Sequence, residues 1–193
     1  MQKILISSTR KSSGKTIISI GLSGLATKLG YTVQTFKKGP DFIDPSWLKF
    51  ASKRPCYNLD FNTMSDNEIK KMYKNKSTNC DIGIIEGTKG LFDGVDTDGS
   101  DSNAQLAKLL KTEAILVIDC KGITRGIAPL LLGYKNFDKD INMKRLILNN
   151  VSTSRHESKL IASVSKYTDF KVIGSLPHIE AIIDERHLGL VPS

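Results

Sequence analysis

The sequence predicts an α/β fold in which helices cover both faces of a doubly wound, mostly parallel sheet. Short apolar runs typical of buried strands alternate with longer segments whose apolar residues recur at helical spacing. About six segments of each kind follow one another, and such alternation builds parallel βαβ units. We find no internal repeat, low-complexity block or linker, so we expect residues 1–193 to form a single domain.

The first strand and the first helix enclose a loop suited to a phosphate group. Residues 4–6 are apolar, residues 7–16 are mostly small and polar, and helical spacing begins at Ile17. A loop that ends in Gly-Lys-Thr between a strand and a helix has the context of a P-loop. We therefore expect Lys15 to reach the β- and γ-phosphates of ATP, and the Thr16 hydroxyl to bind Mg²⁺. The fold is accordingly predicted to be P-loop NTPase-like.

The phosphate loop departs from the full pattern at one position. Thr9 stands where the P-loop motif has its first glycine, while Ser12, Ser13 and Gly14 keep the loop small. Backbone N–H groups of a small loop, together with the positive end of the following helix, attract an anion. These features predict a variant P-loop.

A second loop follows the predicted strand 31–36 and carries two carboxylates. Asp41 and Asp44 lie near the carboxyl end of that strand, where ligands bind in open α/β sheets. Both are candidates for Mg²⁺ binding or for capping a helix. Asp44 followed by Pro45 fits a helix start with Asp44 as N-cap, whereas Asp41 is favoured as a functional residue.

The predicted strand 81–86 ends in Glu86, and a glycine-rich loop with Asp93 follows at residues 88–94. An acid at the end of a buried strand can hold Mg²⁺ or its water shell opposite the loop threonine.

The second half continues with a helix at 104–110, strands at 114–119 and 145–149, and a helix at 158–167. Asn149 ends one of these strands. Its amide suits recognition of a purine edge, although a turn asparagine explains it equally well.

Composition limits the partners. The net charge is +8, but the lysines are scattered without regular aromatic interleaving, so we expect no nucleic-acid binding. No apolar run approaches the roughly 20 residues that cross a bilayer, and the N-terminus leads directly into a strand. Three cysteines lie far apart, as expected for buried thiols in a cytoplasmic protein. Basic residues near the site are expected to attract a multiply anionic small substrate.

Four motifs in chain order resemble the cobyrinic acid a,c-diamide synthase family. They are residues 38–45, 86–94, 148–151 with Arg155-His156, and 185–192, so the resemblance covers essentially the whole chain. The family's synthetase half is similar to dethiobiotin synthetase. The resemblance implies ATP-dependent amidation of the a- and c-acetate carboxylates of a corrin-type tetrapyrrole, through an acyl phosphate, in cobalamin biosynthesis.

The resemblance also implies the roles of individual residues. The implied catalytic residues are Lys15, Asp41, Glu86 and Asp93. The implied Mg²⁺-binding residues are Thr16, Asp41 and Glu86. Asn149 takes the adenine of ATP, whereas the other nucleotide contacts are Ser12, Ser13, Gly14, Lys15 and Thr16. The anionic tetrapyrrole substrate meets Lys37, Phe42, Ile43 and Asp44.

Members of this family usually continue into a class I glutamine amidotransferase domain with a nucleophilic cysteine. Cys56, Cys80 and Cys120 do not lie in a glycine-flanked strand-to-helix turn, so we expect ammonia to come from a separate glutaminase domain or subunit, or from solution. The fold commonly places substrate sites at a dimer interface, which implies a homodimer.

Three alternatives compete with this interpretation. A relative could amidate sirohydrochlorin or its nickel complex. A nucleotide-switch ATPase of the ParA/MinD type requires a lysine near the start of the loop, which Arg10 or Lys11 only loosely provides. A domain that binds nucleotide without turnover is disfavoured by intact Lys15 and Glu86.

Overall fold

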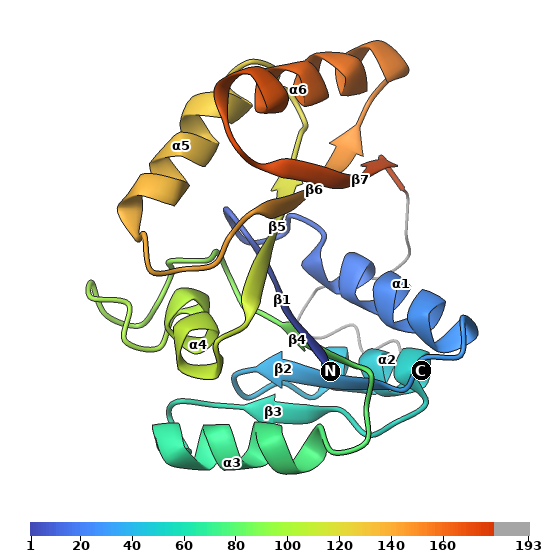
Figure 1. Cartoon of the computed structure of the whole chain (residues 1–193), viewed down its shortest axis with the longest axis vertical. Coiled ribbons are helices and arrows are strands. Elements are labelled where there is room, and N and C mark those ends of the chain that lie inside the picture. Colours follow the sequence, from blue (N-terminus) through green and yellow to red (C-terminus); the bar gives the residue numbers. More distant parts are fainter. Residues whose placement is uncertain (180–193) are drawn as a thin grey trace. The chain divides into compact units, whose positions relative to one another are not determined.

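The computed structural model describes residues 1–179, which form seven strands and six helices (Figure 1). The elements in chain order are β1 (Gln2–Ser8), α1 (Lys15–Lys28), β2 (Val33–Lys38), α2 (Ile43–Ser52), β3 (Tyr57–Leu59), α3 (Asp66–Lys76), β4 (Ile82–Glu86), α4 (Asn103–Leu110), β5 (Glu113–Asp119), α5 (Ile127–Phe137), β6 (Arg145–Val151), α6 (Ser154–Tyr167) and β7 (Lys171–Pro177). The motif at 185–192 and His187 lie outside the described residues.

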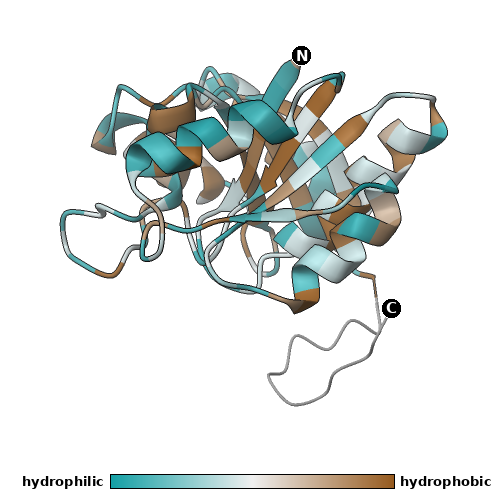
Figure 2. Ribbon diagram, turned by 90° about the horizontal axis from the view of Figure 1, so that it is seen from below, coloured by the Kyte–Doolittle hydropathy of each residue, from teal (hydrophilic) through white to brown (hydrophobic). Residues whose placement is uncertain are grey.

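The strands follow the order β3-β2-β4-β1-β5-β6-β7 in one sheet, and every strand pairing given in detail is parallel. This confirms the predicted α/β fold. Parallel strands buried on both faces are rich in apolar residues throughout, and Figure 2 shows brown, hydrophobic colouring along the strands. The chain divides into two compact units, which are described separately below.

Unit 1 comprises residues 1–6 and 15–88 among those described. Its strands pair as β3-β2-β4-β1, and α1 lies beside α2 (Figure 1). Phe36 of β2 is fully buried and its ring contacts Tyr73 of α3, with centroids 4.7 Å apart. The register brings the ends of β2 and β4 together, because Lys37 stands opposite Glu86.

Unit 2 comprises residues 7–14 and 89–179. Its strands pair as β5-β6-β7, and α5 lies next to α6 (Figure 1). Asn150 has a φ of 58°, and the β6–β7 register shifts between Leu148 and Val151. Asparagine tolerates this left-handed conformation better than most residues, so the irregularity falls at Asn150.

Local signals set most helix ends. Gly30, with a φ of 89°, follows α1 as expected for a glycine that ends a helix. Ser65 and Glu68 form a capping box at the start of α3. That helix continues through Lys76.

The predicted start of α2 was wrong. The helix begins at Ile43, its N-cap residue is Phe42, and Pro45 stands in its first turn. The carboxylate of Asp41 accepts hydrogen bonds from the backbone N–H groups of Ile43 and Asp44. Asp41 therefore performs the capping that the sequence suggested for Asp44, whose side chain binds Lys37 instead.

None of the helices within residues 1–179 is both long and apolar enough to cross a membrane.

Candidate functional site

Glu86 is the centre of a buried polar cluster in unit 1. Its side chain is fully buried at the end of β4. The Thr16 hydroxyl donates to Glu86 Oε1 at 2.6 Å, and Lys37 Nζ donates to the same oxygen at 2.8 Å. Two predicted site residues thus converge on the carboxylate of a third.

Lys37 also contacts both carboxylates of the second loop. Its side chain is only 4% exposed, and the amine binds Asp44 Oδ2 and lies 3.7 Å from Asp41 Oδ2. Burial lowers the pKa of Lys37, but the Glu86 and Asp44 carboxylates outweigh burial and raise that pKa overall. Lys37 therefore carries a firmly held positive charge at neutral pH.

Burial has the opposite consequence for Glu86. It raises the pKa of this carboxyl to about 7, although the positive charge of Lys37 and the hydrogen bond from Thr16 work against the shift. Desolvation disfavours the charged form of an acid. Glu86 is therefore poised to exchange a proton near neutral pH.

A magnesium ion fits the free side of this cluster. Glu86 Oε2 is buried and has no hydrogen-bond partner among the described residues. Mg²⁺ usually keeps several waters and binds one or two protein oxygens together with nucleotide phosphates. The same part of the chain holds no cluster of three or more His, Cys, Asp or Glu side chains arranged for a metal. The donor set thus suits a nucleotide-bound Mg²⁺ better than an ion held by protein ligands alone.

The two apolar residues predicted to meet the substrate are exposed. Phe42 is 88% exposed and Ile43 37% exposed at the start of α2. Asp41, just before them, is fixed by the capping hydrogen bonds and by Asn58, which donates to the Asp41 carbonyl at 2.8 Å. Phe42 is thus an apolar side chain displayed in water beside a fixed acidic loop.

Residues 7–14 of the phosphate loop, described with unit 2, have several of their carbonyl groups occupied by neutral donors. The hydroxyls of Ser8 and Ser13 both donate to the Arg10 carbonyl, at 2.6 and 2.9 Å. Asn149 donates its amide to the Ser13 carbonyl at 3.0 Å. Because the peptide group is planar and trans, a carbonyl held on one side directs the next N–H to the other. Such N–H groups are what an anion-binding loop needs.

Gly14 is required where it stands. Its φ is 93°, and a Cβ atom there would lie 2.2 Å from the Asn149 amide nitrogen. Asn149, the candidate for adenine recognition, is therefore tied to the phosphate loop through Ser13. Ser12, another candidate, also has a positive φ of 58°.

A chain of polar contacts joins the loop to the ends of three strands. Arg10 binds Asp119 at the end of β5, and Asn150 of β6 donates to the other Asp119 oxygen at 2.9 Å. The Nδ1 atom of His178, which follows β7, lies 3.1 Å from the side-chain amide oxygen (Oδ1) of Asn150. Burial raises the pKa of Asp119, but its hydrogen bonds and Arg10 lower it overall.

Asp93, the fourth predicted catalytic residue, lies in unit 2. Its side chain is exposed apart from one contact, in which Asp93 Oδ2 accepts the Gly90 N–H at 2.8 Å. The hydrogen bond closes a tight turn in the glycine-rich loop.

Sequence reasoning missed two residues that contact the phosphate loop, Asp119 and Tyr134. Asp119 ends a buried strand just as Glu86 does, so the same signal was present. Tyr134, in the last turn of α5, donates its hydroxyl to the Thr9 carbonyl at 2.8 Å. No local pattern marks a contact between residues so far apart in the chain.

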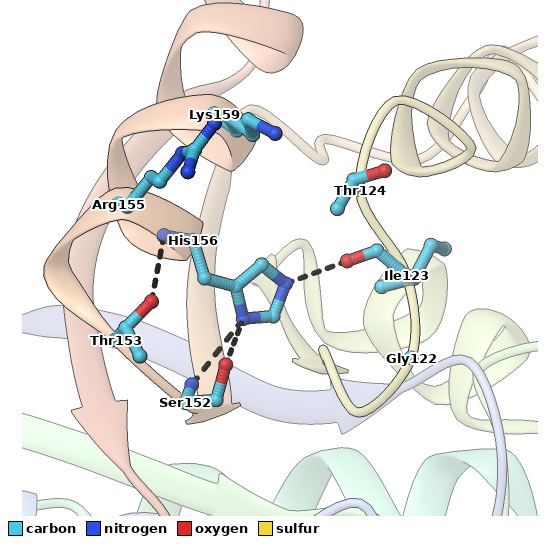
Figure 3. Close-up of a pocket in the computed structure, with 8 residues that line it drawn as sticks. All are labelled: Gly122, Ile123, Thr124, Ser152, Thr153, Arg155, His156 and Lys159. Carbon is cyan, nitrogen blue, oxygen red and sulfur yellow. Dashed lines mark hydrogen bonds between the residues drawn. The ribbon is translucent and has the colours of Figure 1, made fainter.

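The Arg155-His156 motif lies in an open pocket of about 510 Å³ in unit 2 (Figure 3). The His156 ring bridges two loops, with Nε2 2.6 Å from the Ile123 carbonyl and Nδ1 3.0 Å from the Ser152 hydroxyl. Arg155 and Lys159 stand on the same side of α6 (Figure 3). His156 thereby joins the loops that lead into α5 and α6.

Comparison with known proteins identifies the family. Residues 4–191 match a family described as the CobQ/CobB/MinD/ParA nucleotide binding domain. The chain belongs to this family. A nucleotide is thus the expected ligand of the phosphate loop described above.

Curated relatives with high similarity share one name. The cobyrinate a,c-diamide synthase of Magnetococcus marinus is 45% identical over 192 residues, which are 99% of this chain and 41% of that protein. The protein of the same name from Methanosarcina acetivorans is 42% identical over 196 residues, 99% of this chain and 39% of that protein. The chain therefore spans about two fifths of the length of these relatives.

Solved structures share the fold at low sequence identity. The hydrogenase maturation factor HypB of Archaeoglobus fulgidus has a TM-score of 0.58 at 14% identity, over 90% of this chain and 80% of that one. Chloroplast FtsY of Physcomitrella patens has a TM-score of 0.60 at 13% identity, over 89% of this chain and 57% of that one. These likenesses confirm the P-loop NTPase-like fold.

Proposed function

We propose that this chain is the ATP-binding synthetase portion of an enzyme that amidates the a- and c-acetate carboxylates of a corrin-type tetrapyrrole, a step of cobalamin biosynthesis. Residues 1–193 act in this proposal as one synthetase domain. The observation that supports it best is the buried Thr16–Glu86–Lys37 cluster, in a chain 45% identical to a protein named cobyrinate a,c-diamide synthase.

A carboxylate must be activated before ammonia can displace one of its oxygens. In the proposed reaction a substrate carboxylate oxygen attacks the γ-phosphorus of ATP, and ADP leaves with the electrons of the broken P–O bond. Ammonia then attacks the carbonyl carbon of the acyl phosphate, inorganic phosphate leaves, and the nitrogen loses a proton. Phosphoryl transfer of this kind depends on positioning and on charge stabilisation.

The chain's residues divide this work. Lys15 binds the β- and γ-phosphates, and Lys37, held by its carboxylate neighbours, contributes fixed positive potential. Thr16, Asp41 and Glu86 would hold Mg²⁺, which when bound neutralises phosphate charge. These assignments use side chains that the structure gathers in unit 1 or that begin α1.

Asp93 and the start of α2 act on the other reactants. The Asp93 carboxylate accepts the proton that ammonia releases. Its side chain is exposed, and one of its oxygens is fixed by a hydrogen bond from the Gly90 N–H. Phe42 and Ile43 present apolar surface to the macrocycle, and Asp44 fixes Lys37 beside them. Ser12, Ser13 and Gly14 contact the phosphates, and Asn149 contacts adenine.

Turnover by the purified chain tests the proposal. ATP hydrolysis is measured with Mg²⁺ and ammonium chloride, with cobyrinic acid, with sirohydrochlorin and without a tetrapyrrole, and mass spectrometry follows conversion of acid to amide. We expect turnover and amide formation with cobyrinic acid, lost in Lys15→Ala and retained in Lys28→Ala, an exposed lysine at the other end of α1. Amidation of sirohydrochlorin instead would reassign the substrate.

Turnover that ignores both tetrapyrroles but rises with protein concentration or with a surface would contradict the proposal and favour a nucleotide-switch ATPase. Replacing ammonium chloride by glutamine addresses the nitrogen donor. We propose that ammonia is delivered by a separate glutaminase domain or subunit, so glutamine alone should not support amidation by this chain. We also propose a homodimer, which sedimentation measures directly.

A further inference from the structure

Tyr134 contacts two functional loops at once. Its hydroxyl donates to the Thr9 carbonyl of the phosphate loop at 2.8 Å. Its ring lies against Phe92 of the glycine-rich loop, with centroids 5.2 Å apart and planes inclined by 45°. Phe92 is the neighbour of Asp93 in the chain. One side chain on α5 therefore spans from the phosphate loop to the acidic loop, all within unit 2.

The two loops also contact each other directly. Leu91 donates its N–H to the Ser8 carbonyl at 2.7 Å. The buried Asn103 amide donates to the Gly90 carbonyl at 2.9 Å and to the Ser7 hydroxyl at 3.0 Å. A Cβ atom at Gly90 would lie 3.0 Å from the Thr9 carbonyl oxygen. A shift of either loop would therefore press on the other.

The ring contact between Tyr134 and Phe92 is part of a small aromatic cluster. Phe92 is held between two rings of α5, since its centroid is also 4.7 Å from that of Phe137. Edge-on and tilted ring pairs are favourable beyond the area they bury. Burial raises the pKa of Tyr134, and the negative charge of Asp93 adds to the shift, so the hydroxyl remains a donor at neutral pH.

Thr9 is the position where the loop departs from the usual P-loop sequence. Holding its carbonyl on one side directs the Arg10 N–H to the other side of the same planar peptide. We propose that Tyr134 is a positioning residue that sets this peptide for nucleotide binding and couples it, through Phe92, to the loop that carries Asp93. The inference needs only the nucleotide-binding loop, and it rests on the proposed function solely for its turnover measurement.

Two substitutions separate the two contacts of Tyr134. Tyr134→Phe removes the hydrogen bond to Thr9 and keeps the ring, whereas Phe92→Leu weakens the ring contact and keeps the hydroxyl. Tyr167→Phe is the matched control, because Tyr167 lies exposed at the end of α6 and its hydroxyl has no hydrogen bond to a described residue. Thermal unfolding of each variant shows whether the fold is retained.

ATP affinity by calorimetry and amide hydrogen exchange of residues 7–14 and 89–94 are the main measurements. For Tyr134→Phe we expect ATP binding to weaken about 2- to 10-fold, the range of one lost hydrogen bond. Exchange should become faster in both loops. For Phe92→Leu we expect faster exchange in both loops as well, because the Phe92 ring packs on Tyr134 and the adjacent Leu91 donates its N–H to Ser8.

The proposal fails if Tyr134→Phe binds ATP and exchanges amides as Tyr167→Phe does, or if Phe92→Leu alters residues 89–94 alone. In amidation assays Tyr134→Phe should raise the KM for ATP and also lower kcat, because the loss of the hydrogen bond displaces the loop that carries Asp93. Absence of amidation in wild type would contradict the proposed function, while ATP binding and exchange would still decide the role of Tyr134.

Discussion

Different interactions hold two regions of the molecule. One is the Glu86 cluster (Thr16, Lys37, Asp44 and Glu86), and the other is residues 7–14 of the phosphate loop. In the cluster, a fully buried carboxylate and a nearly buried amine bind each other, and Asp44 binds the same amine. In the loop, carbonyl groups accept hydrogen bonds from neutral hydroxyls and one amide, and the one ion pair described there joins Asp119 to the exposed Arg10 side chain.

This difference determines how each region responds to change. Removing one partner of a buried ion pair leaves an uncompensated charge, which is strongly destabilising. Removing one neutral hydrogen bond costs about 0.5–1.5 kcal/mol. The cluster should therefore be sensitive to single substitutions and to pH, and the loop mainly to backbone shape.

Lys37→Met should have the largest effect. It leaves Glu86 and Asp44 without their shared cation and raises the pKa of Glu86 further, and we expect the free energy of unfolding to fall by up to about 3–5 kcal/mol at neutral pH. Urea unfolding measures the change. Lys28→Met, at an exposed lysine, is the control, and the double variant Lys37→Met/Glu86→Gln should recover part of the loss. Equal stability of Lys37→Met and Lys28→Met would show that the cluster is not held by charge.

The second-largest effect should be on the pH dependence of stability, which we expect to come from the Glu86 cluster and not from the phosphate loop. The pKa of Glu86 is about 7 in the folded chain, against 4.5 for an unperturbed glutamate, as in the unfolded chain. Because the folded protein retains this proton to higher pH, the resulting stability is fully present below pH 4.5 and is lost as pH rises through 7. Relative to Glu86→Gln, wild type should lose about 3 kcal/mol across this window. Parallel curves for the two proteins would contradict the shift.

Gly14→Ala should have the smallest of these effects on stability. Its positive φ costs a side chain about 1–3 kcal/mol, and the new Cβ would displace the Asn149 amide. The loss should not vary between pH 4.5 and 7, unlike that of the Glu86 cluster. In an Asn149→Ala background the same substitution should cost less, because the clash is gone. Equal costs in both backgrounds would show that Asn149 does not limit the space at Gly14.

The sequence predicted the fold well because its strong signals are local. Alternating apolar runs located the strands, and Glu86 ends one of them as the sequence predicted. The positions of Lys37 and Glu86 follow from the same logic, since parallel strands end at one edge of the sheet.

Competition between side chains was not predictable from local patterns. Asp44-Pro45 has the composition of a helix start, but the Asp44 carboxylate is drawn to the buried Lys37 amine, which leaves Asp41 to cap α2. Tyr134 is a further case, because only the packing of α5 brings it to Thr9. Contacts of this kind depend on which residues the tertiary fold makes neighbours.

The Glu86 cluster also constrains how this family can change over evolutionary time. A lineage that replaces Lys37 by an apolar residue removes the amine that binds both the buried Glu86 and Asp44, so the first step is harmful by itself. Positions 37 and 86 should therefore vary together among relatives, an amine facing an acid or a neutral pair facing each other. In a sufficiently diverse alignment their covariation should exceed that of positions 14 and 149, which constrain each other by steric contact and not by charge.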